Sequence, residues 1–318
     1  MRAGRGPHGT QPHPLMPLHL GGLSRRQFLV RSMLAGGGVL LGAGRCLGER
    51  LATDLDAWVL FSDPHIAHDP GHTARGINMA ERLATAVREA LGRSTAAAGV
   101  IVNGDLAFNT GETGDYGTFA RLIEPLRATG LPVHLALGNH DHRERFWAAM
   151  REAKSGETVQ ETRQVAVIRA PRANWFVLDT LDRTMSTPGR FGPEQLAWFA
   201  QALDANADRP AIVVAHHNPA LGTLKSSLLD SEAFFAVMRP RRHVKAFIFG
   251  HTHRWGVGQD ESGLHLINLP TTAYVFDPAA ATGWVSAQLS DEGLRLHLHC
   301  LNPAHAEHNR QLELAWRT

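Results

Sequence analysis

The chain has 318 residues, of which 43% are hydrophobic and 19% charged, so it has enough apolar side chains for a large core and is neither disordered nor of low complexity. The 32 Lys and Arg residues nearly balance the 30 Asp and Glu residues, but residues 1–50 hold seven Arg and one acid. The remainder holds 25 basic and 29 acidic residues, which excludes an extended basic surface for nucleic acid.

The first 50 residues have the pattern of an export leader. The segment Ser24-Arg25-Arg26-Gln27-Phe28-Leu29 precedes a weakly apolar stretch at residues 33–43, which is shorter than the ~20 residues of a membrane-spanning helix. A paired-arginine head before a short apolar region is typical of a signal peptide. The segment resembles a twin-arginine signal, which implies the twin-arginine export machinery and a periplasmic or extracellular location. A leader retained as an anchor and a disordered cytosolic extension are the alternatives.

From residue 51 onward, predicted strands alternate with predicted helices. Short runs rich in Val, Ile and Leu predict strands at 57–61, 99–102, 133–137, 211–215 and 244–249. Amphipathic patterns between them predict helices at 79–91, 116–129, 193–203 and 231–238. The pairs 164–168 with 175–178 and 284–289 with 294–300 are expected to be antiparallel. This alternation predicts an α/β fold in a single domain that covers residues 51–318.

Five of the predicted strands end at side chains that can bind metal ions. The segments are Asp63-Pro64-His65, Gly104-Asp105, Gly138-Asn139-His140-Asp141, His216-His217 and Gly250-His251-Thr252-His253. Because the carboxyl ends of strands in an open α/β sheet face one crevice, these distant segments should converge there. Asp63 and His65 are two residues apart, as are His251 and His253, and extended backbone directs such pairs to one side. A glycine directly before three of these candidates allows close backbone approach.

Seven candidate ligands with oxygen and imidazole donors are more than one ion normally takes, so the sequence predicts two metal ions. Two ions ~3.5–4 Å apart clamp the attacking and leaving oxygens of a displacement and acidify a bridging water. This arrangement suits phosphate ester hydrolysis, whose transition state is stabilised mainly by positioning and charge. The mixed donors accept Fe, Mn or Zn, so the identity of the metals stays open.

The ordered motifs resemble the calcineurin-like metallophosphoesterase superfamily and extend over residues 63–253. The resemblance implies a four-layer α-β-β-α sandwich of two mixed sheets flanked by helices. It also implies that one ion is held by Asp63, His65 and His253, that the other is held by Asn139, His216 and His251, and that Asp105 bridges both. His140 would then contact the scissile phosphate and protonate the leaving alkoxide, with Asp141 orienting its imidazole.

Narrower features resemble the branch with cyclic-nucleotide and glycerophosphodiester phosphodiesterases. They are Asp105-Leu106, Gly111, Tyr116 and Leu229-Asp230, although Asn218 interrupts the His-His-Pro sequence that is common in that branch. The resemblance implies hydrolysis of a small phosphodiester by a metal-bridging hydroxide. A phosphomonoesterase with the same core is the alternative, and a nuclease or a non-catalytic scaffold ranks lower.

Two more residues are candidates for contact with the substrate. His217 follows a candidate ligand directly and is expected to support the ligands or to line the pocket. Trp255 lies two residues beyond His253, where it could reach a bound substrate, although core packing is its more common role.

Overall fold

The computed structural model describes residues 53–93, 96–151, 162–220 and 226–318. The predicted leader lies outside the described residues. The chain divides into two units, Met1–Arg50 and Leu51–Thr318, and the following description concerns the second unit.

The first sheet has six strands in the order β14-β13-β12-β1-β4-β5. Strands β1, β4 and β5 are parallel, whereas β12, β13 and β14 run antiparallel to their neighbours, so the sheet is mixed. The bounds are β1 Thr53–Ser62, β4 Ala96–Asn103, β5 Val133–Ala136, β12 Gly283–Leu289, β13 Gly293–Cys300 and β14 Gln311–Ala315.

The second sheet has six strands in the order β10-β11-β9-β8-β7-β6. Its four central strands are parallel, and the edge strands β6 and β10 are antiparallel to their neighbours. The bounds are β6 Ala166–Arg169, β7 Asn174–Val177, β8 Ala211–Val214, β9 Val244–Phe249, β10 Gly256–Gln259 and β11 His265–Asn268.

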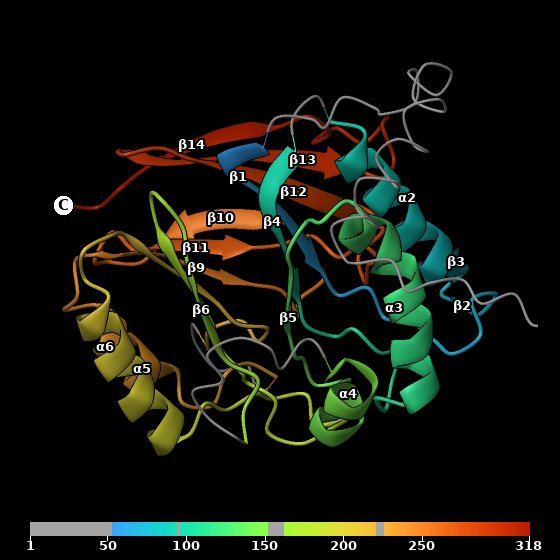
Figure 1. Ribbon diagram of the computed structural model, residues 1–318, viewed down its shortest axis with the longest axis horizontal. Coiled ribbons are helices and arrows are strands. Elements are labelled where there is room, and N and C mark those ends of the chain that lie inside the picture. Colours follow the sequence, from blue (N-terminus) through green and yellow to red (C-terminus); the bar gives the residue numbers. More distant parts are fainter. Residues whose placement is uncertain (1–52, 94–95, 152–161, 221–225) are drawn as a thin grey trace, which may run out of the picture. The chain divides into compact units, whose positions relative to one another are not determined.

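Helices cover the outer face of each sheet (Figure 1). The helices α2 (Met79–Leu91), α3 (Thr113–Ala128) and α4 (Arg143–Ala149) lie on the side of the first sheet, and α5 (Pro193–Ala205) and α6 (Ser231–Met238) pack on the second. A small hairpin, β2 (Thr73–Ala74) with β3 (Ile77–Asn78), precedes α2. The four-layer α-β-β-α sandwich implied by the sequence is confirmed.

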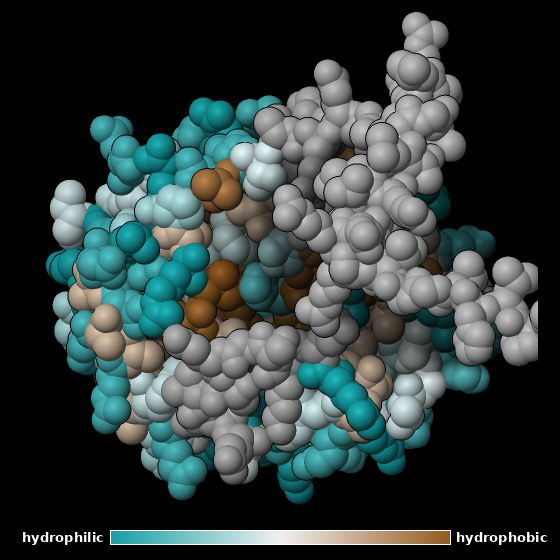
Figure 2. Space-filling view, viewed as in Figure 1, coloured by the Kyte–Doolittle hydropathy of each residue, from teal (hydrophilic) through white to brown (hydrophobic). Residues whose placement is uncertain are grey.

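Three hydrophobic clusters fill the spaces between these layers. Along β1, Val59 and Phe61 pack against α2 and α3, whereas Trp58 and Leu60 pack between the two sheets. This alternation follows from the two-residue period of a strand, which sends neighbouring side chains to opposite faces. The third cluster joins the second sheet to α5 and α6. On the face drawn in the space-filling view, the coloured surface is mainly hydrophilic, and a few hydrophobic side chains show near the middle (Figure 2).

The register of the sheets brings the strand ends level with one another. Ser62 at the end of β1 pairs with Asn103, and Asn103 pairs with Ala136 at the end of β5. In the second sheet Val214 of β8 pairs with Ile248 of β9. The residues that follow these strands therefore emerge along a common edge.

The helices at 79–91 and 231–238 have the predicted bounds, and α3 begins three residues earlier than predicted. The pairs β6–β7 and β12–β13 are antiparallel, as predicted. The sequence did not predict β10, β11, β14, α4 or the β2–β3 hairpin. Within the described part of the chain, every helix is too short or too polar to span a membrane.

Candidate active site

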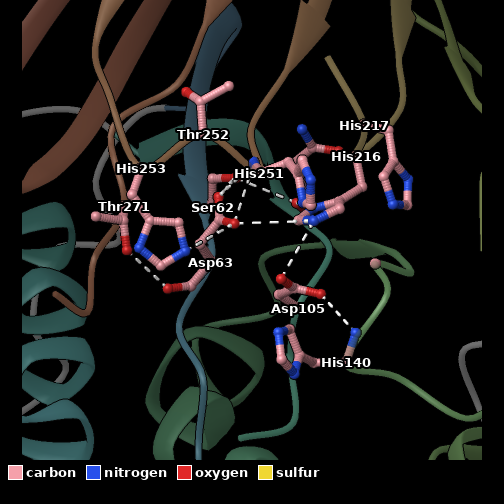
Figure 3. A network of polar contacts seen from close by, with 12 residues as sticks. Ser62, Asp63, Asp105, His140, His216, His217, His251, Thr252, His253 and Thr271 are labelled. Atoms are coloured by element: carbon pink, nitrogen blue, oxygen red, sulfur yellow. Dashed lines mark hydrogen bonds and ion pairs between the residues drawn. The ribbon is translucent and has the colours of Figure 1, made fainter. Parts of the chain in front are cut away.

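The polar residues that follow β1, β4, β8 and β9 converge at the common edge of the sheets. Figure 3 shows the side chains of Asp63, Asp105 and His216 pointing toward one another. The candidate ligands form two groups, and within each group one ligand atom per residue lies within 4.8 Å of all the others. Asp105 belongs to both groups. One group is Asp63, His65, Asp105 and His253, and the other is Asp105, His216 and His251. Except for Asn139, these are the two ligand sets expected from the sequence.

Asn139 borders the same cavity as Asp105 and is only 4% exposed. Within the described residues its Oδ1 atom is buried and has no hydrogen-bond partner. A buried amide oxygen without a partner is costly, so a cation at this position would satisfy it.

Five of the seven expected ligands have left-handed backbone, with φ values of 51° at Asp63, 49° at His65, 48° at Asp105, 68° at His251 and 54° at His253. Non-glycine residues rarely adopt this conformation, and such strain is concentrated at functional sites. The expectation of extended backbone at the i, i+2 pairs is therefore wrong. Because of this backbone, His253 joins the group that contains Asp63, whereas His251 joins the group that contains His216.

Hydrogen bonds hold the Asp63 carboxylate in place. Its Oδ2 atom accepts a 2.5 Å hydrogen bond from the Ser62 hydroxyl, and the backbone N–H of His251 lies 3.1 and 3.2 Å from its two oxygens. Its Oδ1 atom faces Nε2 of His253 at 3.5 Å. Asp63 therefore ties β1 to the loop after β9 and keeps one oxygen directed into the cluster.

Backbone carbonyls orient the imidazoles. Nδ1 of His65 donates to the Phe108 carbonyl at 3.3 Å, and Nδ1 of His216 donates to the Asn103 carbonyl at 2.9 Å. In the same way, Nδ1 of His253 donates to the Tyr274 carbonyl at 2.6 Å. In the neutral rings that bind a metal ion, these contacts place the proton on Nδ1 and the Nε2 lone pair toward the cluster.

His251 has the opposite orientation. Its Nε2 atom lies 3.0 Å from the carbonyl of Ser226, so Nδ1 is the atom left to bind a cation. The sequence shows the spacing of these histidines but not which ring nitrogen faces inward, because the partner carbonyls come from distant loops.

Burial keeps two of the histidines neutral, as ligation requires. It lowers the pKa of His65 to about 3 and that of His251 to about 4. Burial would also lower the pKa of His216, but the charges of Asp105 and Asp63 outweigh it and raise this pKa to about 10. The pKa of Asp105 lies well below its usual value because His216 outweighs the effect of burial.

The cluster fits metal ions. Nε2 of His65 and Nε2 of His253 face each other at 3.0 Å, although both atoms are acceptors when each Nδ1 carries the proton. Asp105 Oδ2 lies 3.3 Å from Nε2 of His216 and 3.6 Å from Nε2 of His65. Converging lone pairs of this kind need cations between them, and mixed imidazole and carboxylate donors suit transition metals.

The three glycines before the expected ligands are required by close packing. A Cβ atom at Gly250 would collide with the Ser62 hydroxyl, and one at Gly104 would lie 2.6 Å from Nδ1 of His216. Gly104 also has a φ of 75°. This confirms the expectation that these positions allow close backbone approach.

Replacing Gly138 by alanine is expected to destabilise the fold. The new Cβ atom would collide with Oδ1 of Asp105 and lie 2.6 Å from its backbone nitrogen. Overpacking of this kind costs about 1–3 kcal/mol, measured as a lower urea midpoint. The control is Gly117→Ala in α3, where the nearest atom to the new Cβ is in Arg121 at 3.9 Å. There alanine should stabilise the helix by about 0.5–1 kcal/mol, and equal effects of both changes would contradict the prediction.

A cavity of about 640 Å³ opens above the cluster. Its lining combines expected ligands with other residues from five loops: His65, Asp105, Asn139, His140, Thr187, Asn218, Ser226, His251, Thr252, His253, Arg254, Tyr274 and Phe276. This volume is in the range of small-ligand pockets, ~300–1,000 Å³. A small substrate can therefore reach the ligand cluster.

His140 borders this cavity, but Asp141 does not orient it. Nδ1 of His140 donates to the carbonyl of Asn109 at 2.9 Å, and its backbone N–H donates to Asp105 Oδ1 at 2.8 Å. The direct Asp141–His140 contact implied by the resemblance is wrong. The Asp141 side chain is buried beneath the loops, where burial and the charge of Asp105 raise its pKa to about 7.

Asp141 instead joins its own loop after β5 to the loop after β4 and to helix α3. Its carboxylate accepts hydrogen bonds from the backbone N–H groups of Leu106, Ala107 and Gly138 and from the Tyr116 hydroxyl, at 2.9–3.2 Å. The Tyr116 hydroxyl in turn accepts a 2.7 Å hydrogen bond from the backbone of His142. Asp141 therefore positions the loops that carry Asp105 and His140.

The two candidates for substrate contact do not line the cavity. His217 is fully buried, its Nδ1 atom lies 2.8 Å from the Thr180 hydroxyl, and its ring packs 4.7 Å from that of His251. It is placed to support the ligands. Trp255 is half-buried against the core between the sheets and is not among the residues that line the cavity. The backbone turns after His253 and directs Arg254, not Trp255, to the cavity.

The sequence analysis missed several residues of the cavity wall. Thr187, Ser226, Tyr274 and Phe276 come from loops that carry no motif. The sequence offers one signal for these residues. Tyr274 and Phe276 are two aromatic residues in a segment between strands that has no helical pattern.

Comparison with known proteins supports this view of the site. A family model for calcineurin-like phosphoesterases matches residues 59–255. The chain is 26% identical over 259 residues to the 3′,5′-cyclic adenosine monophosphate phosphodiesterase CpdA of Pseudomonas aeruginosa, which covers 76% of this chain and 89% of the relative. It is 32% identical over 210 residues to a probable cyclic nucleotide phosphodiesterase of Rhodopseudomonas palustris, which covers 62% of this chain and 71% of the relative.

Among solved structures, a dimetal phosphatase from Danio rerio has a TM-score of 0.64 at 17% identity and covers 83% of this chain and 99% of its own. The likeness to the solved structure shows the fold alone. The family model matches more than half of the chain and therefore shows the family. The ligand cluster, the fold and these matches lead to one assignment. The chain belongs to the calcineurin-like phosphoesterase family and is a metal-dependent phosphoester hydrolase.

Proposed function

We propose that the enzyme hydrolyses nucleoside 3′,5′-cyclic monophosphates at a dinuclear metal centre. The observation that carries this proposal is the pair of ligand groups that share Asp105 at the base of a cavity bordered by His140. The relatives named as cyclic nucleotide phosphodiesterases support the choice of substrate.

The ligand residues divide between two ions. Asp63, His65 and His253 would hold one ion, Asn139, His216 and His251 would hold the other, and Asp105 would contact both. Bound metal ions polarise a phosphate and lower the pKa of a coordinated water. The protein supplies fixed donor positions, because backbone carbonyls lock the imidazoles of His65, His216 and His253.

His140 would protonate the leaving oxygen. Its hydrogen bond to the Asn109 carbonyl fixes the ring at the cavity wall, and its ring centroid lies 5.0 Å from that of His65. With Nδ1 bound to the carbonyl, Nε2 is the atom that can deliver a proton to substrate. The hydrogen bond from its backbone to Asp105 couples its position to the metal ligands.

The charge of the cavity favours a diester over a monoester. Among the described lining residues, Arg254 is the one Arg or Lys, and it lies 3.5 Å from Asp277. A monoester dianion gains most from several cationic side chains, whereas a diester carries a single negative charge. The acid-phosphatase-like alternative is therefore less favoured.

The direct test combines elemental analysis with a substrate panel. We expect about two transition metal ions per chain. The value of kcat/KM should be higher for cyclic AMP than for a glycerophosphodiester or p-nitrophenyl phosphate. Removal of the metals with a chelator should abolish turnover, and adding Mn²⁺ or Zn²⁺ should restore it. A preference for p-nitrophenyl phosphate, or activity after the metals are removed, would contradict the proposal.

We also propose that residues 24–29 direct export by the twin-arginine route. The support is the paired Arg25 and Arg26 before a short apolar stretch. Changing both residues to Lys should keep the charge but abolish export, which fractionation of cells would show as enzyme retained in the cytoplasm. The matched control changes Arg2 and Arg5 to Lys. Export of the Arg25 and Arg26 double variant at the normal level would disprove the role.

A further inference from the structure

The wall of the cavity differs between its two sides. On the side of His251 the lining is polar and includes Ser226, whose carbonyl contacts that histidine at 3.0 Å. On the side of His253 the lining includes Arg254 and two aromatic residues, Tyr274 and Phe276. The ring centroids of His253 and Phe276 lie 4.6 Å apart, so the aromatic wall begins directly beside the ligand cluster.

Phe276 is unusually exposed for a phenylalanine. Its relative exposure is 56%, and the described residues contain three other large hydrophobic side chains in this class: Leu55, Met185 and Leu229. An exposed aromatic ring at the rim of a cavity is a common mark of ligand contact, because covering it with a ligand removes apolar surface from water.

A strained hairpin places a cation on this ring. Arg75 and Gly76 form the two-residue turn between β2 and β3, with φ values of 53° and 77°. Positive φ at both positions is the type I′ turn, which favours Asn or Gly rather than Arg at the first position. The guanidinium carbon of Arg75 nevertheless lies 4.9 Å from the Phe276 ring centroid and 5.7 Å from that of Tyr274.

Two independent features therefore indicate the same spot: an apolar ring left in solvent and an arginine held in an unfavourable conformation above it. Neither contributes to the hydrophobic core, and neither is among the proposed ligands. A flat aromatic group with polar edges suits such a wall, because it can cover the ring while its edge atoms accept hydrogen bonds from a guanidinium.

We propose that Phe276, with Tyr274 and Arg75, forms the binding site for the nucleobase of the substrate. This inference rests on the proposed function, in which the phosphate of a cyclic nucleotide lies at the ligand cluster. The base then contacts the wall next to His253, and the wall sets the affinity for nucleotides over diesters that lack a base.

The test compares cyclic AMP with methyl riboside 3′,5′-cyclic phosphate, which has the same cyclic diester but no base. Phe276→Ala should raise the KM for cyclic AMP about tenfold, the loss expected for one base–aromatic contact. The KM for the base-free diester should change less than twofold. Phe276→Leu, which keeps an apolar cover on His253, should show a smaller rise with unchanged metal content. Leu55→Ala, an equally exposed residue at the start of β1, is the control.

Arg75→Asn tests the hairpin separately. Asparagine accepts the left-handed turn, so the melting temperature should not fall while the KM for cyclic AMP rises. Equal changes with both diesters, or an unchanged KM in both Phe276 variants, would overturn the inference.

Binding of 5′-AMP by calorimetry separates the inference from the proposed function. If the wild-type enzyme does not cleave cyclic AMP but Phe276→Ala weakens 5′-AMP binding, the proposed substrate is wrong and the base site stands. If neither KM nor 5′-AMP binding responds to Phe276→Ala, the base site is wrong.

Discussion

Replacing Asp105 by asparagine is expected to reduce phosphodiester hydrolysis by more than ~100-fold, because even residues behind metal ligands contribute 10–100-fold. Asp105 is the residue that both ligand groups share, so the loss of its charge weakens both proposed ion sites. Elemental analysis should show fewer than two ions per chain in the variant.

The fold should survive this change. Asparagine keeps an Oδ1 atom for the 2.8 Å hydrogen bond from the backbone of His140. Its amide would stand where Oδ2 now lies 3.3 Å from Nε2 of His216, a position from which it can donate to a neutral imidazole. The circular dichroism spectrum should therefore match that of the wild type. Asp208→Asn, an exposed change beside Arg209, is the control, and wild-type turnover by the Asp105 variant would contradict the assignment.

The apolar pattern is sufficient to predict the central elements. Strand β9 and the helices α2 and α6 have the bounds predicted from the sequence, because each has a sustained apolar pattern. The missed elements lack such a pattern. Helix α4 has seven residues and buries Phe146, whereas β10 contains two glycines in four residues. Short elements of this kind depend on tertiary packing, which local sequence does not show.

The positions of the ligands can be predicted because they follow predicted strands, and the resemblance implied their division into two groups. The backbone conformation that produces this division was not predicted. The left-handed backbone at His251 and His253 sends these two side chains to different groups. The partners of Asp141 were also not predicted, because they depend on the conformation of the loops. Its carboxylate accepts hydrogen bonds from backbone N–H groups of the loop after β4 and of Gly138. A motif specifies which residue is present, but the loop conformation decides what that residue contacts.

Replacing His140 by alanine should slow cyclic AMP hydrolysis by ~10²–10⁴-fold, the usual contribution of a general acid. The proposed role is protonation of an alkoxide, which is a poor leaving group. The effect should therefore depend on the leaving group. Bis-p-nitrophenyl phosphate releases a nitrophenolate that needs little protonation, so its hydrolysis should fall much less than that of cyclic AMP.

This dependence separates acid catalysis from damage to the metal centre. Loss of metal would slow both substrates, because both need the ions at the phosphate. His142→Ala is the matched control, since His142 is nearby but pairs with Glu144 at 3.0 Å rather than bordering the cavity. If the His140 variant loses equal factors on both substrates while its metal content is normal, His140 binds the phosphate without donating the proton.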